Sequence, residues 1–249
     1  MSYTLKSNFI KNTNLIRLNK IIASSGYCSR RKADVLISKG LVTVNRKVTT
    51  DLGIKINDNA EIIINGKKLK RQNFVYILLN KPINVITTNY DPQNRRKVID
   101  LIDLKNIRVF PVGRLDRNTT GVLLLTNDGK LTNFLTHPSN NITKIYKVTL
   151  DKKFNESDIS KLQKGINLED GITKIDKIFV FPKFKNIIQL EIHSGKNRIV
   201  RRLLEHLEYN VLELDRISFA GIKYGTLKTS QSRLLNSKEL SLLKKQQKR

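Results

Sequence analysis

A short polar segment, KKLKRQN at residues 67–73, divides the 249-residue chain into two parts with different patterns. The part before it contains short helical patterns followed by short strands, whereas strands dominate the part after it. Polar, basic segments of this kind are typical of the boundary between two domains. We therefore expect a small domain over residues 16–70 and a larger one over residues 75–240.

The small domain is expected to hold two helices followed by two strands. Apolar residues recur at helical spacing over residues 18–22. Ser29 then fits the N-cap of a second helix, with basic residues in its first turn, and Gly40 fits its C-terminal end. Short apolar runs predict strands at residues 41–44 and 60–64, with a turn at residues 45–47.

The large domain reads as an α+β fold built on a mixed, largely antiparallel sheet with flanking helices, because strands outnumber helices and short polar turns join them. The predicted strands are residues 74–79, 121–126, 145–150, 174–181, 187–193 and 211–219. The predicted helices are residues 131–136, 156–164 and 198–207, and a basic tail from residue 237 starts as a helix.

The charge of the chain points to a polyanionic partner. Lys and Arg total 47 against 21 Asp and Glu, a formal net charge of +26. A compositional bias toward Lys, Ile and Asn would also raise the charge. Residues 1–71 nevertheless carry 15 basic and 4 acidic residues, so the charge is concentrated near the N-terminus. This uneven distribution favours binding to nucleic acid.

Several classes of site have no pattern in this sequence. A single cysteine, Cys28, rules out an internal disulfide, and the three histidines do not stand at zinc-ligand spacing. Phosphate-binding loops, dinucleotide fingerprints and serine-hydrolase elbows are missing. No apolar run approaches a bilayer span, and the first twenty residues resemble no secretory signal. We expect a cytoplasmic protein that needs neither cofactor nor metal.

Residues 113–129, GRLDRNTTGVLLLTNDG, are the segment with the clearest chemical character. Asp116 lies between Arg114 and Arg117, in a polar loop before an apolar strand. Nearby cations favour the ionised carboxylate, which can act as a nucleophile or a general base. The residues alone leave a second interpretation open, a surface loop whose charges offset one another.

This segment resembles the catalytic signature G-R-L-D-x-x-T-x-G-L-L-L-L-T-N-D-G of the bacterial pseudouridine synthases that modify single sites in ribosomal RNA. The main departure is Val122, where leucine is usual. The resemblance extends from about Arg17 to Leu240, and Asp116 matches the family's catalytic aspartate.

Three further segments resemble family motifs in the same order. Residues 76–82, YILLNKP, resemble the strand and turn that open the catalytic domain. Tyr146 in KIYKV matches the active-site tyrosine that stacks on the target base, although an aromatic on a strand also suits a core. Arg201 in GKNRIVRRLL matches the residue that pairs with the aspartate. Arg198 and Arg202 fit a basic helix face turned toward phosphates.

Residues 17–66 resemble the S4 RNA-binding domain through R-L-x-K-x-x-A followed by S-R-R. A helix N-terminus surrounded by basic side chains also suits an anion on physical grounds. The residues expected to contact RNA are Arg17, Lys20, Arg30, Arg31 and Lys32 in this domain, with Arg114, Arg117, Arg198 and Arg202 in the other.

The resemblance implies an enzyme that isomerises one uridine of ribosomal RNA (rRNA) to pseudouridine, more closely similar to the members that act on the large subunit (23S) than to the small-subunit (16S) member. Asp116 would act at the ribose, either by attacking C1′ or by removing the 2′ proton. Catalytically silent assembly factors and S4-type binders with an unrelated second domain are the alternatives. The expected partner is rRNA or a ribosomal assembly intermediate. We expect the protein to be a monomer that does not bind a membrane.

Overall fold

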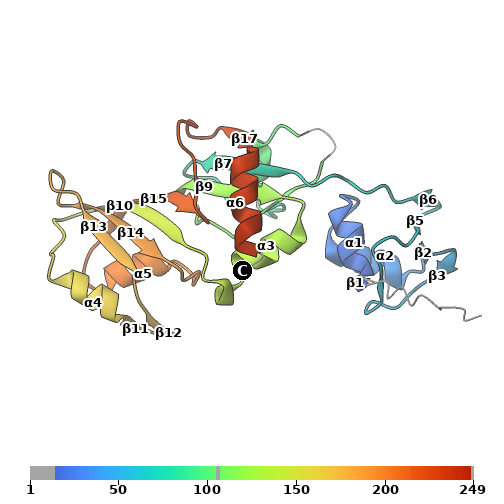
Figure 1. The fold of residues 1–249 in the computed structure, drawn as a ribbon, viewed down its shortest axis with the longest axis horizontal. Coiled ribbons are helices and arrows are strands. Elements are labelled where there is room, and N and C mark those ends of the chain that lie inside the picture. The colour runs from blue at the N-terminus through green and yellow to red at the C-terminus, as the bar shows by residue number, and fades with distance from the viewer. Residues whose placement is uncertain (1–14, 105–106, 248–249) are drawn as a thin grey trace, which may run out of the picture. The chain divides into compact units, whose positions relative to one another are not determined.

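The computed structural model describes residues 15–104 and 107–247. The chain separates into two compact units, which meet in sequence between Asn73 and Phe74 (Figure 1). Within the described ranges, no helix has the length and apolar composition needed to cross a lipid bilayer.

The first unit contains two short helices and six short strands around one small core. Ser29 is the N-cap of the second helix, as predicted, since its hydroxyl accepts a hydrogen bond from the Lys32 amide at 3.2 Å. Gly40 follows this helix with a φ of +68°, the left-handed conformation that glycine adopts most readily. The helices are α1 (Leu18–Ser24) and α2 (Arg30–Ser38).

The strands of this unit form two antiparallel sheets. A four-stranded sheet has the order β3-β2-β5-β6, and β1 pairs with β4. Apolar residues from both helices and from β2, β4 and β5 fill the core between them. The strands are β1 (Leu15–Arg17), β2 (Val42–Val44), β3 (Lys47–Val48), β4 (Lys55–Asn57), β5 (Ile62–Ile64) and β6 (Lys67–Lys68).

The second unit is built on a nine-stranded sheet of order β13-β14-β10-β15-β9-β7-β17, with β16 paired to β15 and β8 to β9. All its pairings are antiparallel except the one between β15 and β9. The predicted α+β class with a largely antiparallel sheet is therefore confirmed. The strands are β7 (Tyr76–Lys81), β8 (Phe110–Pro111), β9 (Thr120–Thr126), β10 (Lys144–Leu150), β13 (Lys177–Val180), β14 (Ile187–Ile192), β15 (Val211–Phe219), β16 (Ile222–Lys223) and β17 (Ser232–Leu234).

Helices cover this sheet, and β11 (Ile166–Leu168) and β12 (Gly171–Thr173) form a separate hairpin. In Figure 1, α3 and α6 lie beside β7 and β9, whereas α4 and α5 accompany β10, β13 and β14. The α-helices are α3 (Gly129–Thr136), α4 (Asp158–Lys164), α5 (Ile199–Glu205) and α6 (Ser237–Gln247), and two 3-10 turns span Val98–Leu101 and Pro138–Asn140.

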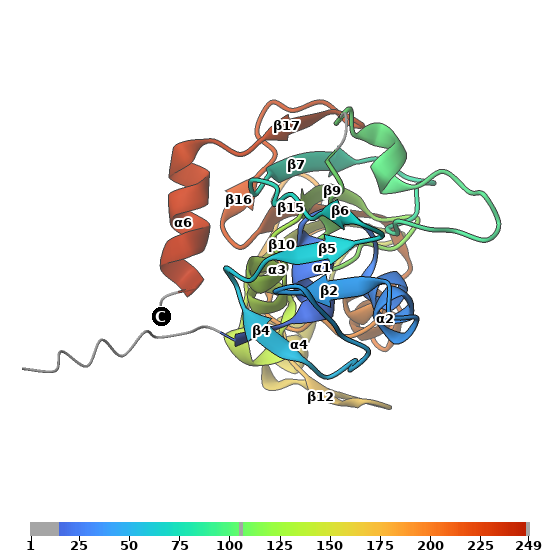
Figure 2. The same ribbon diagram turned by 90° about the vertical axis from the view of Figure 1, so that its right-hand side faces the viewer.

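Strands β7 and β9 are buried on both faces. Leu78 and Leu124 belong to a core shared with α3 and α6, whereas Ile77, Leu79 and Leu123 belong to a core covered by segment 82–109. Figure 2 shows α6 and residues 82–104 on opposite sides of these strands. Burial of both faces explains why the sequence here is a continuous apolar run and not an alternating one.

Several predicted boundaries were wrong, among them the strand predicted over residues 74–79, which spans Tyr76–Lys81. Two others have a clear physical reason. The strand predicted over residues 174–181 spans only Lys177–Val180, because Ile175 leaves the sheet and packs in the core near α4. The helix predicted to begin at Arg198 begins at Ile199, since Arg198 has a left-handed φ of +47° and precedes the helix as its N-cap.

The two halves of the sheet meet at the single parallel pairing, where Asp215 and Arg216 of β15 pair with Thr120 and Gly121 of β9. Gly121 has a φ of +101°, and a Cβ atom on it would overlap the Arg216 carbonyl oxygen and the Asp215 carboxylate. Only glycine allows the two strands to approach this closely.

We predict that Gly121→Ala destabilises the protein by about 2–4 kcal/mol, because the substitution adds backbone strain and an overlap with backbone atoms. The melting temperature should fall by roughly 5–15 °C, measured by circular dichroism. Gly129→Ala is the matched control, because a Cβ at that position meets nothing within 4 Å. Equal melting temperatures for the two variants would contradict the tight junction.

Candidate active site

Asp116 lies in the loop of residues 112–119 that joins β8 to β9, hereafter the Asp116 loop. Its side chain is half-buried, and its carbonyl oxygen accepts a hydrogen bond from the Thr119 amide at 3.1 Å, which closes a turn. Leu115 before it is buried in the core under segment 82–109. The loop therefore anchors an apolar side chain in the core while the adjacent carboxylate remains accessible.

A buried lysine donates hydrogen bonds to the backbone of this loop. Lys81, at the end of β7, has no exposed surface, and its ammonium donates to the carbonyl oxygens of Pro82, Arg117 and Thr119 at 2.9, 3.3 and 2.9 Å. Burial lowers the pKa of Lys81 to about 8, and the charge of Asp116 partly opposes that shift. The ammonium therefore fixes the loop backbone and lies within electrostatic range of the carboxylate.

Arg201 in α5 also donates a hydrogen bond to the backbone of this loop. Its guanidinium donates to the carbonyl oxygens of Val211 at 2.8 Å and Asn118 at 3.3 Å. Burial, and then the charge of Arg198, lower the pKa of Arg201, while Asp116 opposes the shift. The two predicted partners are thus close enough to interact electrostatically, although no ion pair within 4.0 Å joins them in the described part of the chain.

Segment 82–109 supplies a third support for the loop. The Thr87 hydroxyl donates to the Leu115 carbonyl oxygen at 2.7 Å and accepts from the Leu115 amide at 3.2 Å. The Asn84 amide donates to the Arg117 carbonyl oxygen at 2.9 Å. Contacts on several sides preorganise the backbone around Asp116.

Tyr146 lies in β10, half-buried between two apolar cores. Its partners across the sheet are Leu190 in β14 and Arg216 in β15, and the register shifts between Ile145 and Tyr146. Arg216 is buried, and the Tyr146 side chain interacts with its guanidinium.

Pairwise interactions connect these residues across the sheet junction. Asp116 and Arg216 both affect the pKa of Lys81, and Asp116 also affects the pKa of Arg201. Tyr146 in turn affects the pKa of Arg216. The structure therefore gathers the three predicted catalytic residues in one region of the second unit, together with two buried cations.

The other predicted residues of this unit lie around that region. Arg114, Arg117 and Arg198 are exposed, as residues that contact a large ligand must be. Arg202 instead directs its guanidinium at Asp170, with two hydrogen bonds of 2.8 Å. A phosphate would have to displace that carboxylate to reach Arg202.

The predicted basic residues of the first unit all lie at its surface. Among the described residues, none of their side chains takes part in an ion pair, so their charges are available to a ligand. They are Arg17, Lys20, Arg30, Arg31 and Lys32.

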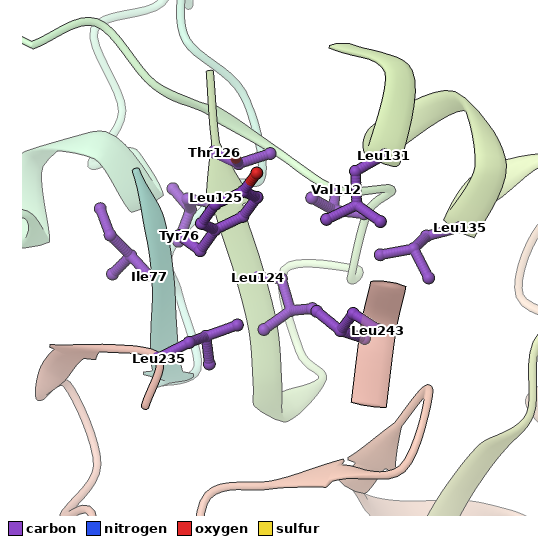
Figure 3. Close-up of a pocket in the computed structure, with 10 residues that line it drawn as sticks. All are labelled: Tyr76, Ile77, Val112, Leu124, Leu125, Thr126, Leu131, Leu135, Leu235 and Leu243. Carbon is purple, nitrogen blue, oxygen red and sulfur yellow. The ribbon is translucent and has the colours of Figure 1, made fainter. Parts of the chain in front are cut away.

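A small apolar cavity in the second unit lies apart from these residues. Figure 3 shows the side chains of Leu124, Leu131, Leu135 and Leu243 converging on it, with Tyr76 among the other lining residues. None of the predicted site residues lines it. The cavity is a packing gap in the core.

Comparison with known proteins identifies the chain. The family model described as RNA pseudouridylate synthase matches residues 75–206, and the S4 domain model matches residues 16–62. The chain belongs to the RNA pseudouridylate synthase family. The resemblance noted in the sequence is therefore confirmed.

Relatives from this family match nearly the full length of the chain. "Ribosomal large subunit pseudouridine synthase B" of Bacillus subtilis is 42% identical over 92% of this chain and 95% of its own length. "Dual-specificity RNA pseudouridine synthase RluF" of Escherichia coli is 35% identical over 84% of this chain and 73% of its own length. A solved pseudouridylate synthase structure superposes with a TM-score of 0.67 at 27% identity, covering 92% of this chain and 99% of that one.

Sequence reasoning missed two buried cations of this candidate site. Lys81 ends an apolar strand, and Arg216 stands two residues after Leu214 on the inward face of β15. A charged residue at an inward position of a strand was the available signal, because such residues are rarely buried without a partner.

We predict that Lys81 gives the synthase a distinctive pH dependence of stability. Its pKa of about 8 in the folded chain lies below the ordinary 10.5, so between these pH values the unfolded chain binds more protons. The contribution of Lys81 to the free energy of unfolding should therefore rise from pH 8 to pH 10.5. Urea unfolding of wild type and Lys81→Met across this window measures it.

Exposed Lys130 on α3 supplies the control, because Lys130→Met removes an ammonium that stays in water in both states. The difference between wild type and Lys130→Met should stay flat across the same window. A flat difference for Lys81→Met as well would contradict the burial of its ammonium.

Proposed function

We propose that this chain isomerises one uridine of large-subunit rRNA to pseudouridine, with Asp116 acting on the ribose of the target nucleotide. The observation that carries the proposal is the Asp116 loop, whose backbone Lys81, Arg201 and Thr87 hold from different sides. The loop presents a half-buried carboxylate in the region that also contains Tyr146.

The surroundings of Asp116 suit chemistry at an electron-deficient carbon. Lys81 and Arg201 both lie within electrostatic range of its carboxylate. An ionised carboxylate on a preorganised loop can attack C1′ of the ribose or remove the 2′ proton. Either step breaks the bond between C1′ and N1 of the base.

Tyr146 is suited to hold the base while it turns. Stacking on an aromatic ring is worth roughly 1–3 kcal/mol per base and tolerates rotation within the stacking plane. The base has to leave its place in the RNA first, at a cost of a few kcal/mol that contacts to the RNA backbone must offset. After rotation, C5 of the base bonds to C1′ as Asp116 leaves C1′ or returns the proton to C2′. C5 then loses its proton and N1 gains one.

We further propose that residues 16–70 act as the RNA-binding domain and residues 75–240 as the catalytic domain. The exposed basic residues at α1 and α2 support the first assignment, because backbone phosphates dominate the affinity of proteins for nucleic acids. Exposed Arg114, Arg117 and Arg198 would extend these contacts around Asp116, and Arg202 would do so on release of Asp170.

The choice of the large subunit rests on the name of the Bacillus subtilis relative. The Escherichia coli relative is described as dual-specificity, which makes a second class of RNA substrate a specific alternative. We propose that the protein acts as a monomer in the cytoplasm, on rRNA or on an assembly intermediate. The molar mass of the purified protein, measured by light scattering, tests whether it is a monomer.

We predict that Asp116→Asn lowers pseudouridine formation by roughly 1,000-fold or more, because it removes the group that acts on the ribose. The melting temperature and the affinity for rRNA should stay close to those of the wild type. Product is measured by chromatography of nucleosides from digested rRNA, and affinity by filter binding.

Asp103→Asn, the same change at an exposed carboxylate of this unit, should leave all three quantities unchanged. An Asp116→Asn variant that still forms pseudouridine at the wild-type rate would show that another residue performs this step. A wild-type protein that binds rRNA and forms no product would instead favour an RNA-binding assembly factor.

A further inference from the structure

Arg216 occupies a position where the fold alone gives little reason for a charged side chain. It follows buried Leu214 by two residues in β15, so both side chains point to the same face of the sheet, and only 3% of Arg216 is exposed. Burial lowers the pKa of its guanidinium, and Tyr146 partly opposes that shift. A cation is costly here unless its N–H groups find acceptors.

Those N–H groups are only partly satisfied within the chain. Nε donates to the Val122 carbonyl oxygen at 2.8 Å, and the guanidinium carbon lies 4.6 Å from the centre of the Phe219 ring. The Tyr146 side chain also interacts with the guanidinium, yet Nη2 is buried and makes no hydrogen bond within 3.5 Å to the residues that the structure describes. A buried unpaired donor in a native protein calls for an explanation, and a ligand is one.

Two other cations lie within electrostatic range of this guanidinium. Burial is the main cause that lowers the pKa values of Lys81 and Lys144 to about 8, and repulsion by Arg216 adds to both shifts. The carboxylates that oppose the shifts are Asp116 for Lys81 and Asp176 for Lys144. Repulsion among Arg216, Lys81 and Lys144 would be relieved by a ligand that carries negative charge.

The target base is the ligand that the proposed function brings here. Arg216 lies directly opposite Tyr146 in the pairing of β15 with β10, and such partners have Cβ atoms about 5 Å apart. If Tyr146 holds the base, as the proposed function requires, Arg216 lies beside the edge of that base. Uracil presents oxygen acceptors at C2 and C4 along its edges.

We propose that Arg216 is a further catalytic residue, whose Nη2 donates to a carbonyl oxygen of the target uracil and stabilises the base as an anion once it has left the ribose. The inference rests on the proposed function. Its chemistry starts when the bond between C1′ and N1 breaks and its electron pair moves to N1.

The resulting negative charge spreads from N1 to the oxygens at C2 and C4. Asp116 compensates at the ribose, by bonding to C1′ or by taking the 2′ proton. When C5 attacks C1′, Asp116 leaves C1′ or returns the proton to C2′, and the base becomes neutral again. C5 then loses its proton while N1 takes one up, which gives pseudouridine. No oxidant or reductant is needed. A fixed donor in a buried site stabilises charge that develops during such a reaction.

The test compares wild type with Arg216→Met and Arg216→Lys on large-subunit rRNA transcripts made with uridine or with 5-fluorouridine. Rates of C–C linked product are measured with saturating protein in single turnovers, and RNA affinity is measured separately. Fluorine at C5 withdraws electrons and stabilises the detached base by itself. A variant that has lost stabilisation of the anion should therefore be less impaired on the fluorinated RNA.

We expect Arg216→Met to lower the maximal rate on uridine RNA by about 100-fold, and on fluorouridine RNA by only about 10-fold. Arg216→Lys keeps the charge, so its loss of maximal rate on each RNA should be smaller than that of Arg216→Met. The loss should again be larger on uridine RNA than on fluorouridine RNA. The affinity for RNA should change little. If the Met variant fails to fold, the rate losses of the Lys variant on uridine RNA and on fluorouridine RNA test the inference.

Arg233→Met is the matched control, because that guanidinium is already held by Glu239 at 2.7 and 2.8 Å. It should lower the melting temperature without a difference between the two RNAs. Equal deficits of the Arg216 variants on both RNAs would overturn the inference in favour of a structural role. Weaker RNA binding with an unchanged maximal rate would overturn it in favour of a phosphate contact. A wild type inactive on both RNAs would overturn the proposed function and this inference together.

Discussion

The parallel pairing of β15 with β9 is the contact on which the site depends. It joins two residues of each strand, yet it brings the Asp116 loop, which leads into β9, to the half of the sheet that carries Tyr146. Gly121 permits the approach because it has no Cβ, and the Arg216 side chain bridges the same junction through the Val122 carbonyl oxygen. The contact between β15 and β9 that joins the two halves of the sheet therefore also forms the centre of the site.

Buried cations distinguish this region from an ordinary core. Lys81, Arg201 and Arg216 are withdrawn from water, and each donates to backbone carbonyl oxygens that come together only when the chain is folded. Their desolvation costs stability that an apolar core would keep. In exchange, the buried cations fix the loop around Asp116 and create a positive electrostatic potential before the RNA binds.

Features that depend on neighbouring residues in the sequence were predictable, and features that depend on distant ones were not. Strand β15 has the predicted bounds, Val211–Phe219, because apolar and polar residues alternate over much of its length. Ser29 caps α2 because capping is local. Pairs of two or three residues such as β8 and β16 have no periodicity to detect. The role of Lys81 could not be predicted, because two of its carbonyl acceptors lie 36 and 38 residues away in the sequence. For the same reason, the motifs indicated Asp116, Tyr146 and Arg201, whereas Arg216 emerged only from the folded chain.

The account's central claim is the isomerisation of a single uridine in large-subunit rRNA. Mapping tests it most directly, with purified protein incubated separately with unmodified large-subunit and small-subunit rRNA. Carbodiimide labelling followed by primer extension then locates each pseudouridine. The account predicts one new stop, in the large-subunit RNA alone. A stop in the small-subunit RNA alone would contradict the assigned target, and no stop in either RNA or in ribosomal particles would contradict the enzyme.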